Sequence, residues 1–164
     1  MPQQRFPPGD ADTEPQQSVN PTRQKPRRMP RAVLFVICFA CGVILGALGT
    51  ALHGNIWVLG EPGSGAVVPW GAAVALLILL LALLWAGTTG RSLVEPLVMG
   101  ASTFTVATAA YLWPGADQLM VPYSALAVET VPGPVIASLV WWLGAGVVTL
   151  VSMLLVKWIL LRDR

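Results

Sequence analysis

Four long apolar stretches follow a polar N-terminal segment along this chain. The first covers residues 32–52 and contains 21 residues without a charge. At about 1.5 Å per residue, this length is enough to cross a hydrocarbon core of about 30 Å. Three further apolar stretches cover residues 67–89, 93–113 and 134–161. The pattern predicts an all-α protein in which residues 31–162 form a four-helix transmembrane bundle.

The segment before the first apolar stretch has a different composition. Residues 1–30 contain seven of the 14 prolines, several glutamines and few large apolar side chains. Such a segment cannot bury enough apolar surface to offset the conformational entropy lost on ordering. We therefore expect residues 1–30 to form a disordered cytoplasmic tail.

The end of this tail is strongly basic, and its Lys and Arg residues are Arg23, Lys25, Arg27, Arg28 and, at the first apolar stretch, Arg31. One interpretation is that the run only determines topology, because basic flanks of apolar helices stay in the cytoplasm. The other is that it binds anionic lipid headgroups, worth about 1 kcal/mol per basic residue near the surface. The two interpretations are compatible.

The other charged residues also divide between the two predicted sides of the membrane. All ten Lys and Arg residues lie before the first apolar stretch, between the second and third, or at the end of the fourth. The segments that would then face outward carry only the acidic charges of Glu61, Asp117 and Glu129. We therefore expect a multi-pass protein of the cytoplasmic membrane with both termini in the cytoplasm. An alternative is that the first stretch is a signal peptide, cleaved near residues 47–51.

The overall composition argues against a soluble domain and against a nucleic-acid-binding protein. Only 11% of the residues are charged and 55% are hydrophobic, whereas soluble domains usually contain about 25% charged residues. The net charge of +2 reflects basic residues gathered on one side of a membrane rather than a nucleic-acid-binding surface. The expected partner is the lipid bilayer, and no nucleic acid is expected.

Small residues mark faces where helices can approach each other closely. Gly42, Gly46 and Gly49 form a stripe on the first predicted helix, and Gly100 lies in a third helix rich in Ala, Ser and Thr. Such patterns allow close helix packing in membranes. We expect the third helix to be the most buried of the four. We also expect small-residue faces to pack against another membrane protein or a second copy of this chain.

The two connections on the outward side differ in length. Residues 53–65 are short and rich in turn-forming residues. Residues 114–133 form the longest connection and are too apolar to extend freely into water. A short interfacial helix near residues 124–130 and a re-entrant loop are both compatible with this composition.

Cys38 and Cys41 form a C-x-x-C pattern within the first predicted helix. Paired thiols at this spacing serve redox enzymes when a neighbouring charge favours the thiolate. No such charge and no second cysteine pair accompanies them in the sequence. Buried cysteine ordinarily behaves as a small apolar side chain, so a structural role is favoured over a redox role.

Glu95 is the acidic residue next to a predicted span on the cytoplasmic side. The sequence S-L-V-E at residues 92–95 has the spacing of a capping box, and Pro96 suits a first helical turn. Alternatively, Glu95 itself caps the helix, or it is the intramembrane carboxylate of a proton-coupled transporter. A structural role at the helix end, beside Arg91, is favoured.

The other polar candidates are His53 and the acids Glu61, Asp117 and Glu129, which would share the outer face. Their spacing is not that of a compact metal site, so no metal and no cofactor are predicted. The sequence contains no nucleotide-binding glycine loop, nucleophile elbow or metalloprotease motif. No catalytic residue is therefore predicted.

Two short motifs flank the third predicted helix: R-S-L-V-E-P at residues 91–96 and Y-L-W-P-G-A-D at residues 111–117. With them, residues 32–161 resemble a family of small four-helix integral membrane proteins from actinobacteria whose activity is unassigned. The resemblance implies a topology and no catalytic residues.

These features together favour a non-enzymatic integral membrane protein, an accessory or scaffold subunit that packs with partner helices. The alternative is a small transporter or channel subunit. Small multidrug exporters carry an essential acid in their first span, and this chain has no acid there. A membrane thiol redox protein is the third hypothesis.

Overall fold

The computed structural model describes residues 30–60, 65–115 and 118–163, and this part of the chain is mostly helical. The predicted tail lies outside the described residues except for Pro30. The elements, in chain order, are α1 (Arg31–Leu52), β1 (Trp57–Leu59), β2 (Ala66–Val68), α2 (Trp70–Gly90), α3 (Val94–Tyr111), α4 (Ala125–Thr130) and α5 (Pro132–Arg162).

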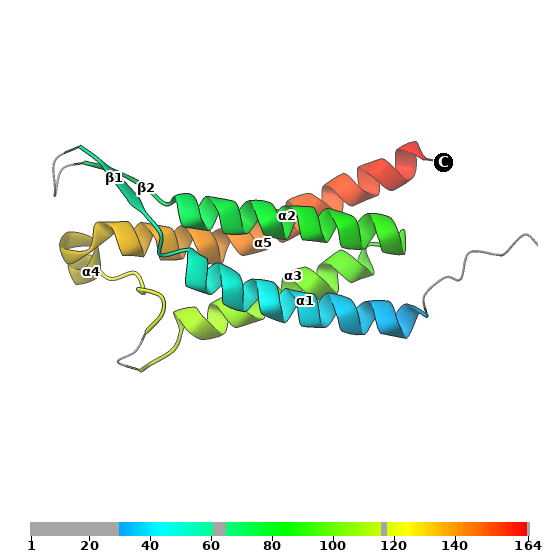
Figure 1. Ribbon diagram of the computed structural model, residues 1–164, viewed down its shortest axis with the longest axis horizontal. Helices are drawn as coiled ribbons and strands as arrows, with labels where there is room; N and C mark the ends of the chain where they lie inside the picture. The colour runs from blue at the N-terminus through cyan, green and yellow to red at the C-terminus, as the bar shows by residue number, and fades with distance from the viewer. Residues whose placement is uncertain (1–29, 61–64, 116–117, 164) are drawn as a thin grey trace, which may run out of the picture.

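The four long helices lie alongside one another and give the molecule two ends (Figure 1). At the first, called the terminal end, α1 begins, α2 turns into α3 and α5 finishes. Arg31, Arg91 and Arg162 lie there. At the opposite end, called the hairpin end, lie β1, β2 and α4.

Three of the helices have the length and composition needed to cross a membrane: α1, α2 and α5. The helix predicted at residues 93–113 is present as α3, but it is not among these three candidates within the described residues. Glu95, Pro96 and several hydroxyl-bearing residues make α3 less apolar than the others. The apolar pattern therefore located all four long helices, whereas length and composition identify only three of them as candidate spans.

The connection after α1 forms a β-hairpin that the sequence did not predict. Strands β1 and β2 pair antiparallel, with Trp57 opposite Val68 and Leu59 opposite Ala66. The ring of Trp57 also lies 5.6 Å from that of Trp70, at the start of α2. Aromatic and β-branched residues favour strands, but two arms of three residues are too short to show a clear alternating pattern. The described chain is therefore mostly, not entirely, α-helical.

Helix α3 contacts all three other long helices, most extensively α1. Its buried hydroxyls are directed at backbone carbonyls. Thr103 Oγ1 donates to the carbonyl oxygen of Gly42 in α1 at 2.9 Å, and Ser102 Oγ donates to that of Met99 at 2.9 Å. Because buried polar groups need such partners, these bonds allow a helix rich in hydroxyls to occupy the interior of the bundle.

Two of the predicted packing glycines permit the close approach of α1 to α3. A Cβ atom on Gly42 would lie 2.3 Å from the Met99 carbonyl oxygen, and one on Gly46 would lie 2.8 Å from Val106 Cβ. Both distances are shorter than non-bonded carbon and oxygen atoms allow. The backbones can therefore meet at these positions only because no side chain is present.

The other two packing glycines contact α5. A Cβ atom on Gly49 would lie 2.2 Å from the indole ring of Trp141, and one on Gly100 would lie 2.3 Å from Thr149 Cγ2. All four glycines therefore lie at contacts between helices of this same chain. The glycine stripe is covered from within and is not left open to another protein.

Of the two arrangements compatible with the sequence of residues 114–133, the structure contains the short helix, α4. Its N-cap residue is Ser124, whose Oγ accepts a hydrogen bond from the Ala127 backbone N–H at 3.1 Å. The segment before α4 is attached to the bundle, because Met120 is fully buried and the Tyr123 N–H donates to the Tyr111 hydroxyl at 2.9 Å.

We predict that Gly42→Ala destabilises the protein. The added methyl group would force α1 and α3 apart, and overpacking of this kind costs about 1–3 kcal/mol. This loss exceeds the gain of up to about 1 kcal/mol from the better helix propensity of alanine. Thermal unfolding of the purified protein in detergent, followed by circular dichroism, measures the difference.

Gly54→Ala is the matched control, because nothing lies within 4 Å of a Cβ atom added there. Its melting temperature should stay close to that of the parent chain. Equal melting temperatures for the two variants would show that the α1–α3 contact does not depend on the missing side chain.

Candidate functional site

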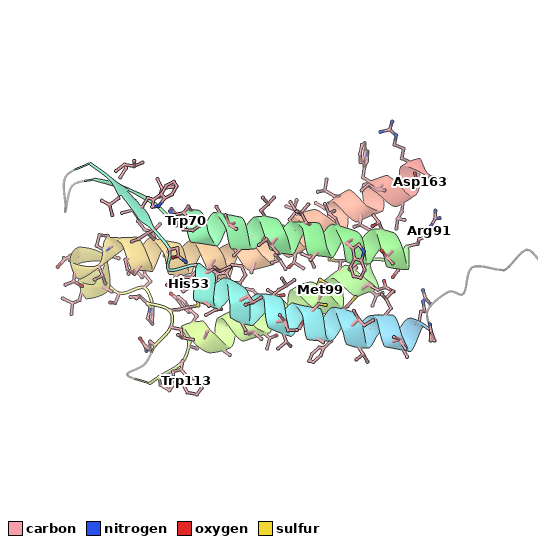
Figure 2. All side chains as sticks on the ribbon, viewed as in Figure 1. His53, Trp70, Arg91, Met99, Trp113 and Asp163 are labelled. Carbon is pink, nitrogen blue, oxygen red and sulfur yellow. The ribbon has the colours of Figure 1, made fainter. Side chains whose placement is uncertain are left out.

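Two groups of buried polar residues lie at opposite ends of the bundle. The first, at the hairpin end, links α1, α5 and the segment before α4 and is called the His53–Ser138 network; its members are Thr50, His53, Val121, Ser138 and Trp141. The second consists of Glu95 and its surroundings at the terminal end. Figure 2 shows His53 near the hairpin end and Arg91, on the α2–α3 turn, at the terminal end.

His53 lies directly after the last residue of α1 and is 4% exposed. Its Nδ1 lies 2.5 Å from the carbonyl oxygen of Thr50, and its Nε2 lies 3.3 Å from Ser138 Oγ. A carbonyl oxygen only accepts hydrogen bonds, so Nδ1 carries the proton. In the neutral ring Nε2 is then an acceptor and receives the Ser138 hydroxyl proton.

Ser138 connects this histidine to the segment before α4. Its Oγ accepts a hydrogen bond from the Val121 backbone N–H at 3.0 Å. Trp141, one turn further along α5, donates its Nε1–H to Thr50 Oγ1 at 3.2 Å. The network therefore holds the end of α1, the first part of α5 and the segment at Val121 in one arrangement.

Burial is the main influence on the charge of His53, and it lowers the pKa of this residue; the hydrogen bond to Thr50 acts in the opposite direction. The neutral ring also fits the bonds described above. Because Nδ1 carries the proton and the lone pair of Nε2 accepts the Ser138 hydroxyl, the ring has no free lone pair for a ligand in this arrangement. The network is therefore suited to holding segments together rather than to chemistry.

Glu95 lies in the first turn of α3 and is 1% exposed. Its Oε2 is buried and has no hydrogen-bond partner among the described residues. The capping role expected for this residue is wrong. The N-cap residue of α3 is Leu93, without a side-chain bond, and Ser92 Oγ accepts from the Val94 N–H at 3.1 Å. The Glu95 side chain turns inward because Gly90 leaves space for it.

The remaining sequence candidates do not meet at either place. Glu129 is exposed on α4, whereas Glu61 and Asp117 lie outside the described residues. In the described part of the chain, no three His, Cys, Asp or Glu side chains come together as a metal site would require. Arg31 is exposed at the start of α1, and Arg23, Lys25, Arg27 and Arg28 lie outside the described residues.

The two cysteines are free thiols on α1. Cys38 is fully buried in a cluster of apolar side chains that includes Leu34, Leu83 and Met99, and Cys41 is partly buried beside it. This environment is that of a core residue.

A shallow apolar groove of about 380 Å³ lies along α3, lined by Phe104, Thr105, Thr108, Ala109 and Leu112. Near the hairpin end, a second surface pocket of about 470 Å³ is lined by Ala109, Ala110, Trp113 and Leu119. Both lie on the side of α3 that the other long helices leave uncovered, since Thr105, Ala109 and Leu112 are exposed.

Sequence reasoning missed Thr50 and Ser138 as partners of His53, the bond from Trp141 to Thr50, and the burial of Glu95. One local signal was available: Thr50 and His53 are three residues apart, as are Ser138 and Trp141, so each pair shares a helix face. The distance between the two pairs along the chain hides their contact. Neither family models, nor curated proteins, nor solved structures match this chain.

We predict that acidification destabilises the hairpin end through His53. Burial lowers the pKa of the folded-state ring, so below the ordinary value of about 6.5 the unfolded chain binds the proton more readily. The contribution of the neutral ring is therefore complete above about pH 6.5 and is lost as the pH falls below it. The melting temperature of the parent chain should therefore decrease through His53 as the pH is lowered from about 7 to about 5.

His53→Asn is the comparison, because it keeps a donor near the position of Nδ1 but cannot be protonated. It should be less stable at neutral pH by about 1–3 kcal/mol, since the Ser138 hydroxyl loses its partner. Its melting temperature should vary less over the same pH range. His53 is the only histidine in the chain, so parallel pH profiles for the two proteins would refute the assignment.

Proposed function

We propose that this chain is a four-span protein of the cytoplasmic membrane that acts as a non-enzymatic accessory or scaffold subunit. Support for a fourth span comes from the way α3 is packed. It contacts α1, α2 and α5, and its 18 residues give a length of about 27 Å at 1.5 Å per residue. Its buried hydroxyls already bond to carbonyls, which is what a helix surrounded by lipid requires.

The proposed orientation rests on where the charges lie. Among the described residues, the basic side chains are those of Arg31, Arg91, Lys157 and Arg162, and all belong to the terminal end. The hairpin end carries the acidic Glu129. Because basic flanks remain in the cytoplasm, the terminal end is the cytoplasmic one. Both the start of α1 and the end of α5 then face the cytoplasm.

We predict that single cysteines at the two ends react on opposite sides of the membrane. In a chain with Cys38→Ala and Cys41→Ala, Glu129→Cys should react with an impermeant maleimide on sealed spheroplasts, because α4 faces outward. Asp163→Cys should react only after lysis. Both residues are exposed, so burial does not decide the result. The opposite labelling pattern would show that the terminal end faces outward and the hairpin end faces the cytoplasm.

The assembly surface that we propose is an exposed face of α3. Ala101, Thr105 and Ala109 are exposed and follow one another at intervals of four residues, so they share one side of the helix. We call this the small face. The outward sides of the other long helices carry large apolar residues suited to lipid, such as Phe39, Leu77 and Leu150. Small exposed residues are instead typical of a contact between membrane helices.

The occupant that we propose for the small face is a second copy of this chain. All copies insert with the same orientation, so two α3 helices would meet in parallel about a two-fold axis with Thr105 near the centre. The groove lined by Phe104, Thr105 and Leu112 lies on the same side and leaves space for the facing helix. A two-fold contact pairs the same face of both copies, so the small face of one copy would pack against the small face of the other.

We predict that Thr105→Cys, in the chain lacking both native cysteines, forms a disulfide-linked dimer in native membranes after mild oxidation. A disulfide needs Cα atoms within about 7 Å, a distance that only a contact through small residues permits. Leu150→Cys, on an exposed side of α5, should remain monomeric. No cross-link at Thr105, together with a strictly monomeric protein in several detergents, would exclude self-assembly through this face.

A small transporter or channel subunit is the second candidate, and the observation that favours it is the buried carboxyl of Glu95. Ionisable groups within membrane domains ordinarily lie on paths for ions or substrates. Ion flux in proteoliposomes separates this candidate from a scaffold.

A further inference from the structure

Glu95 presents an unusual polar atom at the terminal end of the bundle. Its Oε2 is, within the described residues, the single buried side-chain oxygen or nitrogen without a hydrogen-bond partner. The residue as a whole is 1% exposed, so water does not replace that partner at the surface. A carboxylate accepts hydrogen bonds or cations and donates nothing. Burying it without either is costly, so the site requires a positive partner.

Among the described residues, no charged side chain supplies that partner. Arg91 on the α2–α3 turn and Lys157 on α5 are both exposed, and Figure 2 shows Arg91 pointing away from the bundle. Arg31 is exposed at the start of α1. From α1, the titratable group within electrostatic range is the buried Cys38 thiol, which carries no positive charge. Helix α2 contains no titratable residue.

The carboxyl group instead lies against the end of α2. A Cβ atom on Gly90, the last residue of that helix, would lie 2.6 Å from Glu95 Cδ and 3.0 Å from Oε1. The Gly87 carbonyl oxygen already accepts from the N–H groups of Arg91 and Ser92. The carbonyl groups of residues 88–90, however, follow the last intrahelical acceptor and add partial negative charge at a helix C-terminus.

We propose that the Glu95 carboxylate, at the C-terminal end of α2, is a binding site for a small monovalent cation, either a proton or Na⁺. Both satisfy the same requirement, because each neutralises a buried carboxylate and occupies its lone pairs. Carbonyl groups at helix C-terminal ends coordinate such ions in membrane proteins. The lack of a Gly90 side chain is what brings the carboxyl group and the helix end together.

This site is independent of the proposed assembly surface, because Ala101, Thr105 and Ala109 lie on the exposed side of α3 and Glu95 on its buried side. A protein that forms no dimer can still bind the cation. A dimer that binds no cation likewise leaves the assembly proposal intact.

The test compares the melting temperature of the full-length protein with those of Glu95→Gln and Glu129→Gln. If Na⁺ is the ligand, replacing choline chloride by sodium chloride at constant ionic strength raises the melting temperature. The rise is roughly 3–6 °C for each tenfold increase in sodium above its dissociation constant. If the proton is the ligand, the melting temperature of the parent chain measured relative to that of Glu95→Gln falls as the pH is raised, and sodium has no effect. This trend is opposite in sign to that expected from His53.

In Glu95→Gln the sodium response disappears and the pH response is reduced to that of His53, because the amide has nearly the same shape as the carboxyl group but neither binds a cation in this way nor titrates. The response of the parent chain remains in Glu129→Gln, which removes an exposed acid. Gly90→Ala keeps the acid but displaces its carboxyl group, and the response should weaken there as well. Identical sodium and pH responses in the parent chain and Glu95→Gln would overturn the proposal.

A second measurement does not depend on any variant. An apolar carbodiimide reacts with buried, protonated carboxyl groups, and peptide mass spectrometry locates the adduct. Glu95 should be labelled, and raising the pH or adding Na⁺ should slow the reaction. Absence of labelling at Glu95, or labelling that neither pH nor Na⁺ alters, would also overturn the proposal.

Discussion

The close contact between α1 and α3 is the interaction on which the rest of the bundle depends. At Gly42 the two backbones approach so closely that the Thr103 hydroxyl reaches a carbonyl oxygen on the opposite helix at 2.9 Å. A helix with this many hydroxyls is poorly suited to apolar surroundings, and its buried hydroxyls find backbone carbonyls as partners at this contact. Once α3 is held in this way, one side of its first turn faces the bundle, and Glu95 and Pro96 are buried there.

The same stripe positions the opposite end. Beyond Gly42 and Gly46, the third glycine, Gly49, receives the indole ring of Trp141 instead of a backbone. This places the preceding turn of α5 next to the end of α1, where Ser138 meets His53. One row of glycines therefore determines two separate contacts, the packing of α3 against α1 and the His53–Ser138 network. Small-residue rows are usually considered for association between chains, but here the row is used entirely within one chain.

The difference between what the sequence predicted and what it did not follows from the range of the interactions. Helix positions depend on the length of apolar stretches, a local property, and all four long helices were found within a few residues of their bounds. The short helix α4 was one of two arrangements that the apolar residues of its connection allowed. The hairpin and the environment of Glu95 depend on neighbours elsewhere in the chain. Capping boxes are local patterns, so the sequence S-L-V-E at residues 92–95 gave no sign that the glutamate would turn inward.

The two ends of the bundle use buried polar groups in different ways. At the hairpin end every polar atom of the His53 ring has a partner, and a network satisfied in this way stabilises one arrangement. At the terminal end Glu95 Oε2 has none among the described residues, and Gly90 leaves it room against a helix end that is itself electronegative. A satisfied group needs nothing from outside the protein, whereas an unsatisfied carboxylate favours whichever cation can reach it. A site that responds to the cations available in the cell is therefore expected at the terminal end, where α2 turns into α3.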